Sequence, residues 1–191
     1  MKLKQSSLLI ISAALILMSA NSYAGRQGIS FYYGLGLDAI LPQDPTGAGI
    51  DFDPTAGGEA ILGIEEDGWS LEGIAYTSIE AGTDISNLDY SVDGTHLGLA
   101  YRTIEKRNFY YKYKISGTKM DFDLKNTTTN ASATAKTSGS SYTFGVGWRV
   151  DRAERLELDY SYYNSSDIDD AVHLITLKYL WGGTPYQGKS F

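Results

Sequence analysis

Two histidines are the side chains in this sequence best suited to proton transfer, and a serine-rich segment precedes one of them. Ser165 and Ser166, with Asp167 beside them, could approach His173 across a hairpin near the end of the chain. Nucleophilic catalysis needs such groups within hydrogen-bond reach of an oriented base. A histidine beside a polar loop is the simpler interpretation, and His96 is placed inside a predicted strand. We therefore predict no catalytic residues.

Acidic residues gather in the polar segments between the apolar stretches, and clusters of carboxylate oxygens suit Ca²⁺ or Mg²⁺. The run Asp167-x-Asp169-Asp170 lacks the spaced glycine and the distal glutamate of an EF-hand loop. Solubilising charge is the preferred interpretation, so we predict no metal site and no cofactor. The acidic residues concerned are Asp44, Asp51, Asp53, Glu80, Asp84, Asp89, Asp167, Asp169 and Asp170.

Glycine pairs and net charge exclude two further kinds of ligand. Gly34-x-Gly36 is not a phosphate loop, because no predicted helix follows it to supply an anion site. The formal charge of the whole chain is −7, and removal of Lys2 and Lys4 with a leader would make it −9. A chain this acidic is a poor partner for nucleic acid.

The first 24 residues have the pattern of a secretory signal peptide. Lys2 and Lys4 form a basic start, residues 8–18 are apolar, and Ser22-Tyr23-Ala24 offers small residues at a cleavage site. We therefore expect an exported chain that begins near Gly25. The sequence has no cysteine, so neither a lipid anchor after the signal nor a disulfide framework is predicted.

The rest of the chain alternates apolar and other residues with a period of two, which indicates strands. In the segment 142–164, one face carries Tyr142, Phe144, Val146 and Trp148. The opposite face carries Gly145 and its neighbours two residues away on either side. No segment with helical periodicity competes after the signal. The eight predicted strands cover about Ile29–Ile40, Gly57–Glu66, Gly68–Glu80, Tyr90–Thr103, Asn108–Leu124, the two halves of Tyr142–Asn164, and Ala171–Trp181.

The connections between these strands alternate in length. Short turns are expected at Asp67-Gly68, at residues 104–107 and at residues 151–153. Longer polar loops are expected at residues 41–56, 81–89, 125–138 and 164–170. An even strand count with short turns at one end and long loops at the other is typical of outer-membrane barrels. The predicted fold is an all-β, eight-stranded antiparallel up-and-down transmembrane β-barrel, with short turns in the periplasm.

The apolar face of each strand could point into a soluble barrel or sandwich, or outward to lipid. Glycines on the opposite face favour the second arrangement, because a small barrel has little room inside. Gly34, Gly36, Gly63, Gly98, Gly145 and Gly147 are these residues.

The distribution of charges and aromatic residues also favours an apolar face that points to lipid, because the charges lie on the glycine-containing face and the aromatic rings on the apolar face. Buried charges require partners, so we predict an ion-pair network in the lower lumen. Its members are Glu65, Glu72, Arg102, Lys112, Arg149, Glu157, Asp159 and Lys178, with Lys114 as one more cation and Arg149–Glu157 as a pair that closes the floor. Aromatic rings near the short turns predict an interfacial girdle. It comprises Trp69, Tyr101, Phe109, Tyr111, Trp148, Tyr179 and Trp181.

The segment YTFGVGWRVDRAERLELDYSYYN, followed by AVHLITLKYLW, resembles the last three strands of the outer-membrane β-barrel superfamily that includes the OmpA transmembrane domain, OmpX/Ail and the Opa/NspA proteins. The match is carried by a glycine-rich aromatic strand ending in Arg149, a Leu-x-Leu-x-Tyr strand from Leu156, and a final strand closing on Tyr179 and Trp181. The resemblance implies a monomeric barrel inserted by the barrel assembly machinery into a Gram-negative-type outer membrane, in contact with lipid and lipopolysaccharide.

The end of the chain departs from this pattern, because family members usually finish on a strand with a terminal aromatic residue. Here Gly-Gly and Pro185 follow Trp181, and Phe191 stands last. We expect the barrel domain, residues 25–191, to have strands to about residue 181 and a loose periplasmic tail at 182–191. Tyr179-x-Trp181 is then an internal assembly signal.

The resemblance does not fix an activity, so several functions stay open. We favour a non-catalytic envelope protein whose surface loops bind a ligand or host. A small porin-like pore is an alternative, although eight strands leave an interior that side chains nearly fill. A lipid A-modifying enzyme of the PagL type is another alternative. Such enzymes have His and Ser two residues apart on one strand, but in this sequence the residues two positions after the histidines are Gly98 and Ile175, so the motif is not present. A soluble periplasmic barrel is the fourth.

Overall fold

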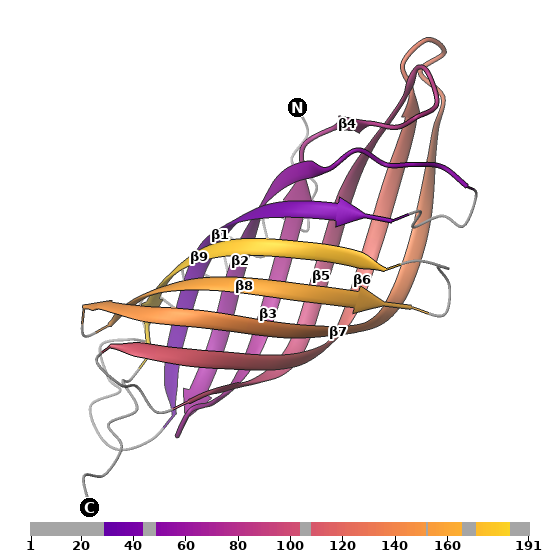
Figure 1. The fold of residues 1–191 in the computed structure, drawn as a ribbon. Coiled ribbons are helices and arrows are strands. Elements are labelled where there is room, and N and C mark those ends of the chain that lie inside the picture. Colours follow the sequence, from indigo (N-terminus) through magenta and orange to yellow (C-terminus); the bar gives the residue numbers. More distant parts are fainter. Residues whose placement is uncertain (1–28, 44–48, 104–107, 152, 166–170, 184–191) are drawn as a thin grey trace, which may run out of the picture.

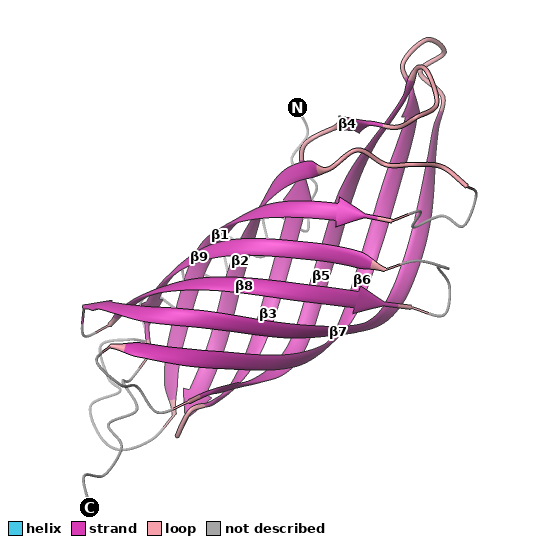
Figure 2. Ribbon diagram, in the orientation of Figure 1, coloured by secondary structure: helices cyan, strands magenta, loops and turns pink. Residues whose placement is uncertain are grey.

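The computed structural model describes residues 29–43, 49–103, 108–151, 153–165 and 171–183, which form strands and their connections (Figures 1 and 2). The predicted leader at 1–24 and the tail beyond residue 183 lie outside the described residues. Among the residues described, there is no helix long and apolar enough to cross a membrane. The strands are β1 Ser30–Pro42, β2 Thr55–Glu66, β3 Trp69–Ser78, β4 Ala81–Gly82, β5 Leu88–Arg102, β6 Phe109–Asn126, β7 Ser132–Asp151, β8 Glu154–Asn164 and β9 Val172–Gly182.

Eight long strands close into a barrel in which sequence neighbours pair antiparallel, while β4 is a two-residue strand in the connection between β3 and β5. Closure is made by β1 and β9, whose register runs from Tyr32↔Gly182 to Pro42↔Val172. Gly182 and Gly183 both have positive φ at the end of β9: the amide of Gly183 donates to Phe31 O at 2.8 Å across this seam, and the amide of Gly182 donates to Ala153 O at 2.7 Å on the β8 side. The predicted eight-stranded barrel is therefore confirmed.

The apolar faces of the strands point away from the barrel axis. Leu37 is 71% exposed and Leu97 is 63% exposed, although both lie in the middle of long strands. The opposite face carries buried glycines and polar residues, and all six glycines predicted to line the lumen are buried. The predicted orientation, with apolar side chains outside and glycine inside, is confirmed.

The polar segment 125–138 is where the structure differs most from the sequence prediction. It is not a long loop: β6 continues to Asn126, β7 begins at Ser132, and the two strands pair throughout, from Phe109↔Trp148 to Lys125↔Ser132. Asn126 stabilises the turn between them, because its Oδ1 accepts the amides of Thr128 and Thr129 at 3.0 and 2.9 Å. Serine and threonine tolerate extended backbone, so low complexity did not mean irregular structure.

This hairpin and the neighbouring β5 rise above the other strands at the end of the barrel with the long connections (Figure 1). The outer parts of β6 and β7 are fixed by cross-strand pairs between side chains. Lys136 Nζ contacts Asp121 Oδ2 at 2.8 Å, and Thr134 Oγ1 donates to Asp123 Oδ1 at 2.6 Å. The tallest part of the molecule is thus a paired sheet.

Three inward tyrosines lie directly over glycines of the neighbouring strand. The pairs are Tyr32 over Gly63, Tyr76 over Gly94 and Tyr110 over Gly147, and each pair is also a register pair. A Cβ atom at any of these glycines would come within 2.1–2.2 Å of a tyrosine ring carbon. The glycines therefore make the room that large side chains need inside a narrow barrel.

We expect Gly147→Ala to lower the free energy of unfolding by about 1–3 kcal/mol, because overpacking forces the ring of Tyr110 out of its position. Gly117→Ala is the matched control on β6, where a Cβ atom meets nothing within 4 Å. The measurement is urea unfolding of the barrel in vesicles. Equal stability of the two variants would contradict this explanation of the inward glycines.

Candidate functional site

The half of the lumen next to the short turns holds buried ion pairs that connect opposite walls of the barrel. Glu157 on β8 accepts from Arg102 Nε of β5 at 2.7 Å and from Lys112 Nζ of β6 at 2.8 Å. Arg102 also donates through Nη2 to Glu72 of β3 at 2.6 Å. These four side chains are at most 5% exposed. Four strand interfaces separate β3 from β8 in either direction round the barrel, so Arg102, which contacts Glu72 and Glu157, connects opposite walls of the lumen.

Further ion pairs extend this arrangement in both directions along the lumen. Toward the long connections, Lys178 Nζ lies 2.8 Å from Glu59 Oε1 and 3.1 Å from Asp159 Oδ2. Toward the short turns, Arg155 Nη1 lies 2.8 Å from Glu65 Oε2. The lumen is therefore occupied by charged side chains over several levels of the barrel.

We call this set the lumen ion-pair cluster, and it contains five carboxylates and five cations. Charge buried in a low dielectric is costly unless it is paired, and the equal numbers meet that requirement. Two tyrosines add hydrogen bonds at the centre: Tyr32 donates to Glu72 at 2.7 Å, and Tyr110 to Glu157 at 2.7 Å. The members are Glu59, Glu65, Glu72, Arg102, Lys112, Lys114, Arg155, Glu157, Asp159 and Lys178.

The structure brings seven of the eight residues predicted for the lumen network into this cluster. The eighth, Arg149, is partly exposed and lies opposite Arg155, beside a register shift between β7 and β8. Its pairing with Glu157 stays a prediction. Sequence reasoning missed Arg155 and Glu59. Arg155 lies close to the turn between β7 and β8. It could have been found from the sequence, because it is two residues before Glu157 on the same strand and therefore points into the lumen.

A cluster of hydroxyl groups surrounds His96 in the lumen, farther from the short turns than Arg102 on the same strand. Its Nδ1 lies 3.1 Å from Ser141 Oγ and 3.0 Å from Thr118 Oγ1, and Ser116 Oγ lies 2.7 Å from Ser141 Oγ. The side chain of Tyr76 packs against the imidazole at 5.0 Å between ring centroids. Every one of these residues is buried, so the arrangement is a closed polar layer. Among the described residues, no three His, Asp or Glu side chains are placed to hold a metal ion.

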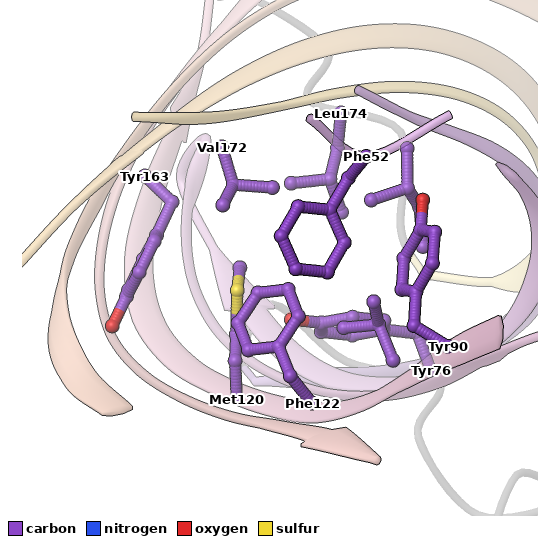
Figure 3. Packing of buried hydrophobic residues seen from close by; sticks show 10 residues of the cluster. Phe52, Tyr76, Tyr90, Met120, Phe122, Tyr163, Val172 and Leu174 are labelled. Atoms are coloured by element: carbon purple, nitrogen blue, oxygen red, sulfur yellow. The ribbon is translucent and has the colours of Figure 1, made fainter. Parts of the chain in front are cut away.

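The half of the lumen next to the long connections is apolar, and Phe52 closes it (Figure 3). Phe52 comes from the connection between β1 and β2, and its ring meets Tyr90 edge-on at 4.8 Å between centroids. Two contacts fix this segment. The backbone of Phe52 forms an isolated antiparallel β-bridge with Thr83, and the hydroxyl of Tyr90 donates to Asp53 O. We call this group the apolar cap. It consists of Ile40, Phe52, Tyr76, Tyr90, Val92, Met120, Phe122, Tyr163, Val172 and Leu174.

On the outer face, the seven residues predicted for the aromatic girdle lie near the short turns and contact one another in groups. Tyr33 and Phe144, which were not predicted, join them: Tyr33 stacks on Trp181 at 5.7 Å and Phe144 on Tyr111 at 6.2 Å. The other ring pairs are Trp69–Tyr101 at 4.9 Å, Phe109–Tyr111 at 5.1 Å, Phe109–Trp148 at 5.4 Å and Tyr179–Trp181 at 4.8 Å.

His173 lies on the outer face nearer the long connections, in contact with aromatic residues. Its Nδ1 is 2.7 Å from the hydroxyl of Tyr160, and its ring packs on Tyr162 at 5.6 Å between centroids. Ser165 donates its hydroxyl to Ser138 O at 2.7 Å. The predicted approach of Ser166 and Asp167 to this histidine lies outside the described residues. The contacts present are those of an aromatic group at an interface.

A closed antiparallel barrel with an apolar outside, a charged inside and an aromatic girdle defines the class of transmembrane β-barrels. The model of the outer membrane protein beta-barrel domain family matches residues 10–180 of this sequence. The chain belongs to this family, and its location is the outer membrane. No curated protein matches the sequence.

Solved structures share the fold at low sequence identity. Neisserial surface protein A (NspA) gives a TM-score of 0.64 at 11% identity over 82% of this chain and 99% of that chain. OprG from Pseudomonas aeruginosa gives 0.61 at 12%, over 84% and 98%. Ail, the attachment invasion locus protein of Yersinia pestis, gives 0.57 at 12%, over 83% and 100%.

Lys112 provides a test of the lumen ion-pair cluster. Lys112→Met removes a buried ammonium that contacts three carboxylates, Glu72, Glu157 and Asp159, and leaves the cluster with one negative charge in excess. We therefore expect a loss of about 3–5 kcal/mol in the free energy of unfolding. Lys136→Met is the matched control, because Lys136 forms one ion pair at 72% exposure and should cost less than about 1 kcal/mol. Urea unfolding in vesicles measures both. A loss below about 1 kcal/mol for Lys112→Met would contradict a role of the cluster in stability.

Proposed function

We propose that this protein is a non-conducting, non-catalytic barrel that supports the outer membrane and presents a binding surface outside the cell. The observation that carries the proposal is that two different kinds of packing fill the lumen. The lumen ion-pair cluster occupies one half, and the apolar cap occupies the other. A solute would have to displace both, and each is fixed by contacts between several strands.

The binding part of the proposal is supported by the height of β5, β6 and β7. Their outer ends carry paired, exposed side chains beyond the level at which β8 stops at Asn164. A sheet held in place by backbone pairing is a more rigid surface than a loop, so less ordering is needed when a partner binds. Adhesion to a partner outside the cell is the function we propose for this sheet.

The outer face supports proposed contacts with lipid and lipopolysaccharide, and with the barrel assembly machinery during insertion. Apolar side chains such as Leu37 form the belt, and the girdle marks the inner interface. The described strands close on one another within one chain, with β1 against β9, so no edge in the barrel wall requires a second subunit. A monomer is therefore the proposed state.

The proposal predicts that the purified barrel does not conduct ions steadily in a planar bilayer. Phe52→Ala should also be silent, because the lumen ion-pair cluster remains when the apolar cap is opened. Heat-dependent gel mobility confirms that each sample is folded before it is measured. A steady conductance from the folded wild-type protein would overturn the proposal in favour of a small pore.

A further inference from the structure

Asp38 on β1 is a buried carboxylate without a close partner among the described residues. It is 4% exposed, and neither Oδ1 nor Oδ2 accepts a hydrogen bond. Thr176 is its register partner on β9 and interacts with it, but not at hydrogen-bond geometry. Glu59, Lys178 and Lys114 act on it electrostatically, yet their ion pairs are made with other residues. A carboxylate buried in this way requires a compensating group.

Asp38 makes the buried charges of the lumen unequal in number. The lumen ion-pair cluster contains five carboxylates and five cations, and Asp38 is a sixth carboxylate. The buried residues that the structure describes include no sixth lysine or arginine. Within this set the interior therefore carries one negative charge in excess, and a single positive charge would remove it.

The buried polar atoms without hydrogen-bond partners show what the lumen lacks. In the described part of the chain there are eight such side-chain atoms, and five of them are carboxylate oxygens. Because an ionised carboxylate only accepts hydrogen bonds, the shortage is mainly of donors or cations. The eight atoms are Asp38 Oδ1 and Oδ2, Glu59 Oε1, Glu72 Oε2, Asp159 Oδ1, the hydroxyl of Tyr76, and Nε and Nη2 of Arg155, which lies near the short turns.

A glycine brings two of these oxygen-bearing side chains together. Glu59 is the register partner of Gly36, which lies two residues before Asp38 on the same inward face. A Cβ atom at Gly36 would lie 3.0 Å from Glu59 Oε1 and 2.9 Å from Thr176 Cγ2, so both side chains lean over the glycine. Residues two apart in a strand are separated by about 7 Å. The carboxylates of Glu59 and Asp38 are thus close enough to share one ion.

Tyr76 provides a third oxygen from β3. It is the register partner of Glu59, it is 4% exposed, and its hydroxyl has no hydrogen-bond partner among the described residues. Its ring extends into the lumen, and it interacts electrostatically with both Asp38 and Glu59 (Figure 3). Because buried tyrosine hydroxyls are normally satisfied, this oxygen indicates a ligand independently of the two carboxylates.

The apolar cap separates this position from the outer end of the barrel. Ile40, the next inward residue of β1 after Asp38, is fully buried and belongs to the cap. On the other side, Glu59 and Lys178 form the nearest part of the lumen ion-pair cluster. An ion held between these two layers would be a fixed part of the folded barrel and would not pass through it.

We propose that the lumen binds one monovalent metal cation, Na⁺ or K⁺, through the carboxylates of Asp38 and Glu59 and the hydroxyl of Tyr76. One positive charge makes the buried charges equal, whereas a divalent ion would leave an excess of the opposite sign. Ca²⁺ takes about six to eight oxygen ligands and Mg²⁺ requires a near-ideal octahedron, which these three side chains do not supply. The site goes beyond the proposed function and does not depend on it.

A proton on Asp38 is the competing way to neutralise the excess charge. A neutral carboxyl group has a single O–H donor, so it can satisfy one acceptor only. The second oxygen of Asp38 and the oxygens of Glu59 and Tyr76 cannot all be satisfied in this way. A cation contacts several oxygens at once, and therefore accounts for the whole group of unpartnered atoms.

Urea unfolding of the full-length barrel in zwitterionic micelles tests the proposal. The protein is refolded and measured in sodium, potassium or tetramethylammonium chloride at equal ionic strength, because the methyl groups of the last cation prevent coordination. In the salt of the preferred metal ion, the equilibrium constant for unfolding should be at least about tenfold smaller than in tetramethylammonium, since the ion binds only the folded state. Equal constants in the three salts would overturn the proposal and favour a proton on Asp38.

Asp38→Asn removes the excess charge while keeping the shape of the side chain. We expect its unfolding to be independent of the cation, so that it is more stable than the wild type in tetramethylammonium and loses this advantage in the preferred salt. Asp121→Asn is the matched control, because Asp121 is an exposed carboxylate paired with Lys136 and should leave the cation dependence unchanged. A cation dependence in Asp38→Asn equal to that of the wild type would place the ion elsewhere and contradict the proposal.

Tyr76→Phe provides a second variant that keeps the ring over Gly94 and loses only the hydroxyl oxygen. The concentration of the preferred ion that gives half of the stabilisation should rise at least about threefold, because one ligand is removed. An unchanged midpoint would exclude Tyr76 from the site.

Discussion

The closure of the barrel depends on the ion pairs that the strands form inside the lumen. Each strand must turn one face to the lumen, and the five carboxylates and five cations of the lumen ion-pair cluster lie there over several levels of the barrel. In the low dielectric of a packed lumen, an unpartnered charge would cost several kcal/mol, whereas paired charges hold opposite walls together. The register of the sheet is thereby constrained, because a slip of one residue would turn Arg102 and Lys112 toward lipid.

Packing in the lumen is ionic next to the short turns and apolar next to the long connections, and inward glycines make room for the large side chains in both halves. Near the short turns, Tyr32 and Tyr110 occupy the spaces over Gly63 and Gly147 and donate to buried carboxylates. Near the long connections, aromatic and aliphatic side chains meet around Phe52, which a connection rather than a strand supplies. Small residues on one strand and large ones on the next fill a narrow barrel. The lumen is thus a core as well as an interior surface.

Two-residue periodicity was sufficient to predict the eight strands, their lipid-facing side and most of the charged lumen, because each of these depends on local alternation. Two features were beyond it. The segment 125–138 pairs as a hairpin, and its side chains find partners such as Asp121 on the opposite strand, which composition does not record. The position of Phe52 depends on a contact with Tyr90 that is distant in sequence, so no local pattern indicates it.

Because Phe52 packs inside the lumen, the connections at the outer end of the barrel differ in how well they tolerate amino-acid substitutions. Residues around Phe52 and Asp53 are tied to Tyr90 and to Gly82, so substitutions there disturb the interior. The turn at 127–131 is held by Asn126 and by the amide of Thr127, which donates to Asn87 O at 2.8 Å, so these contacts join it to the neighbouring connection and not to the apolar cap. Sequence drift under selection by antibodies or phage would therefore accumulate at this turn first, and it is also the site at which a foreign epitope can be displayed without altering the barrel.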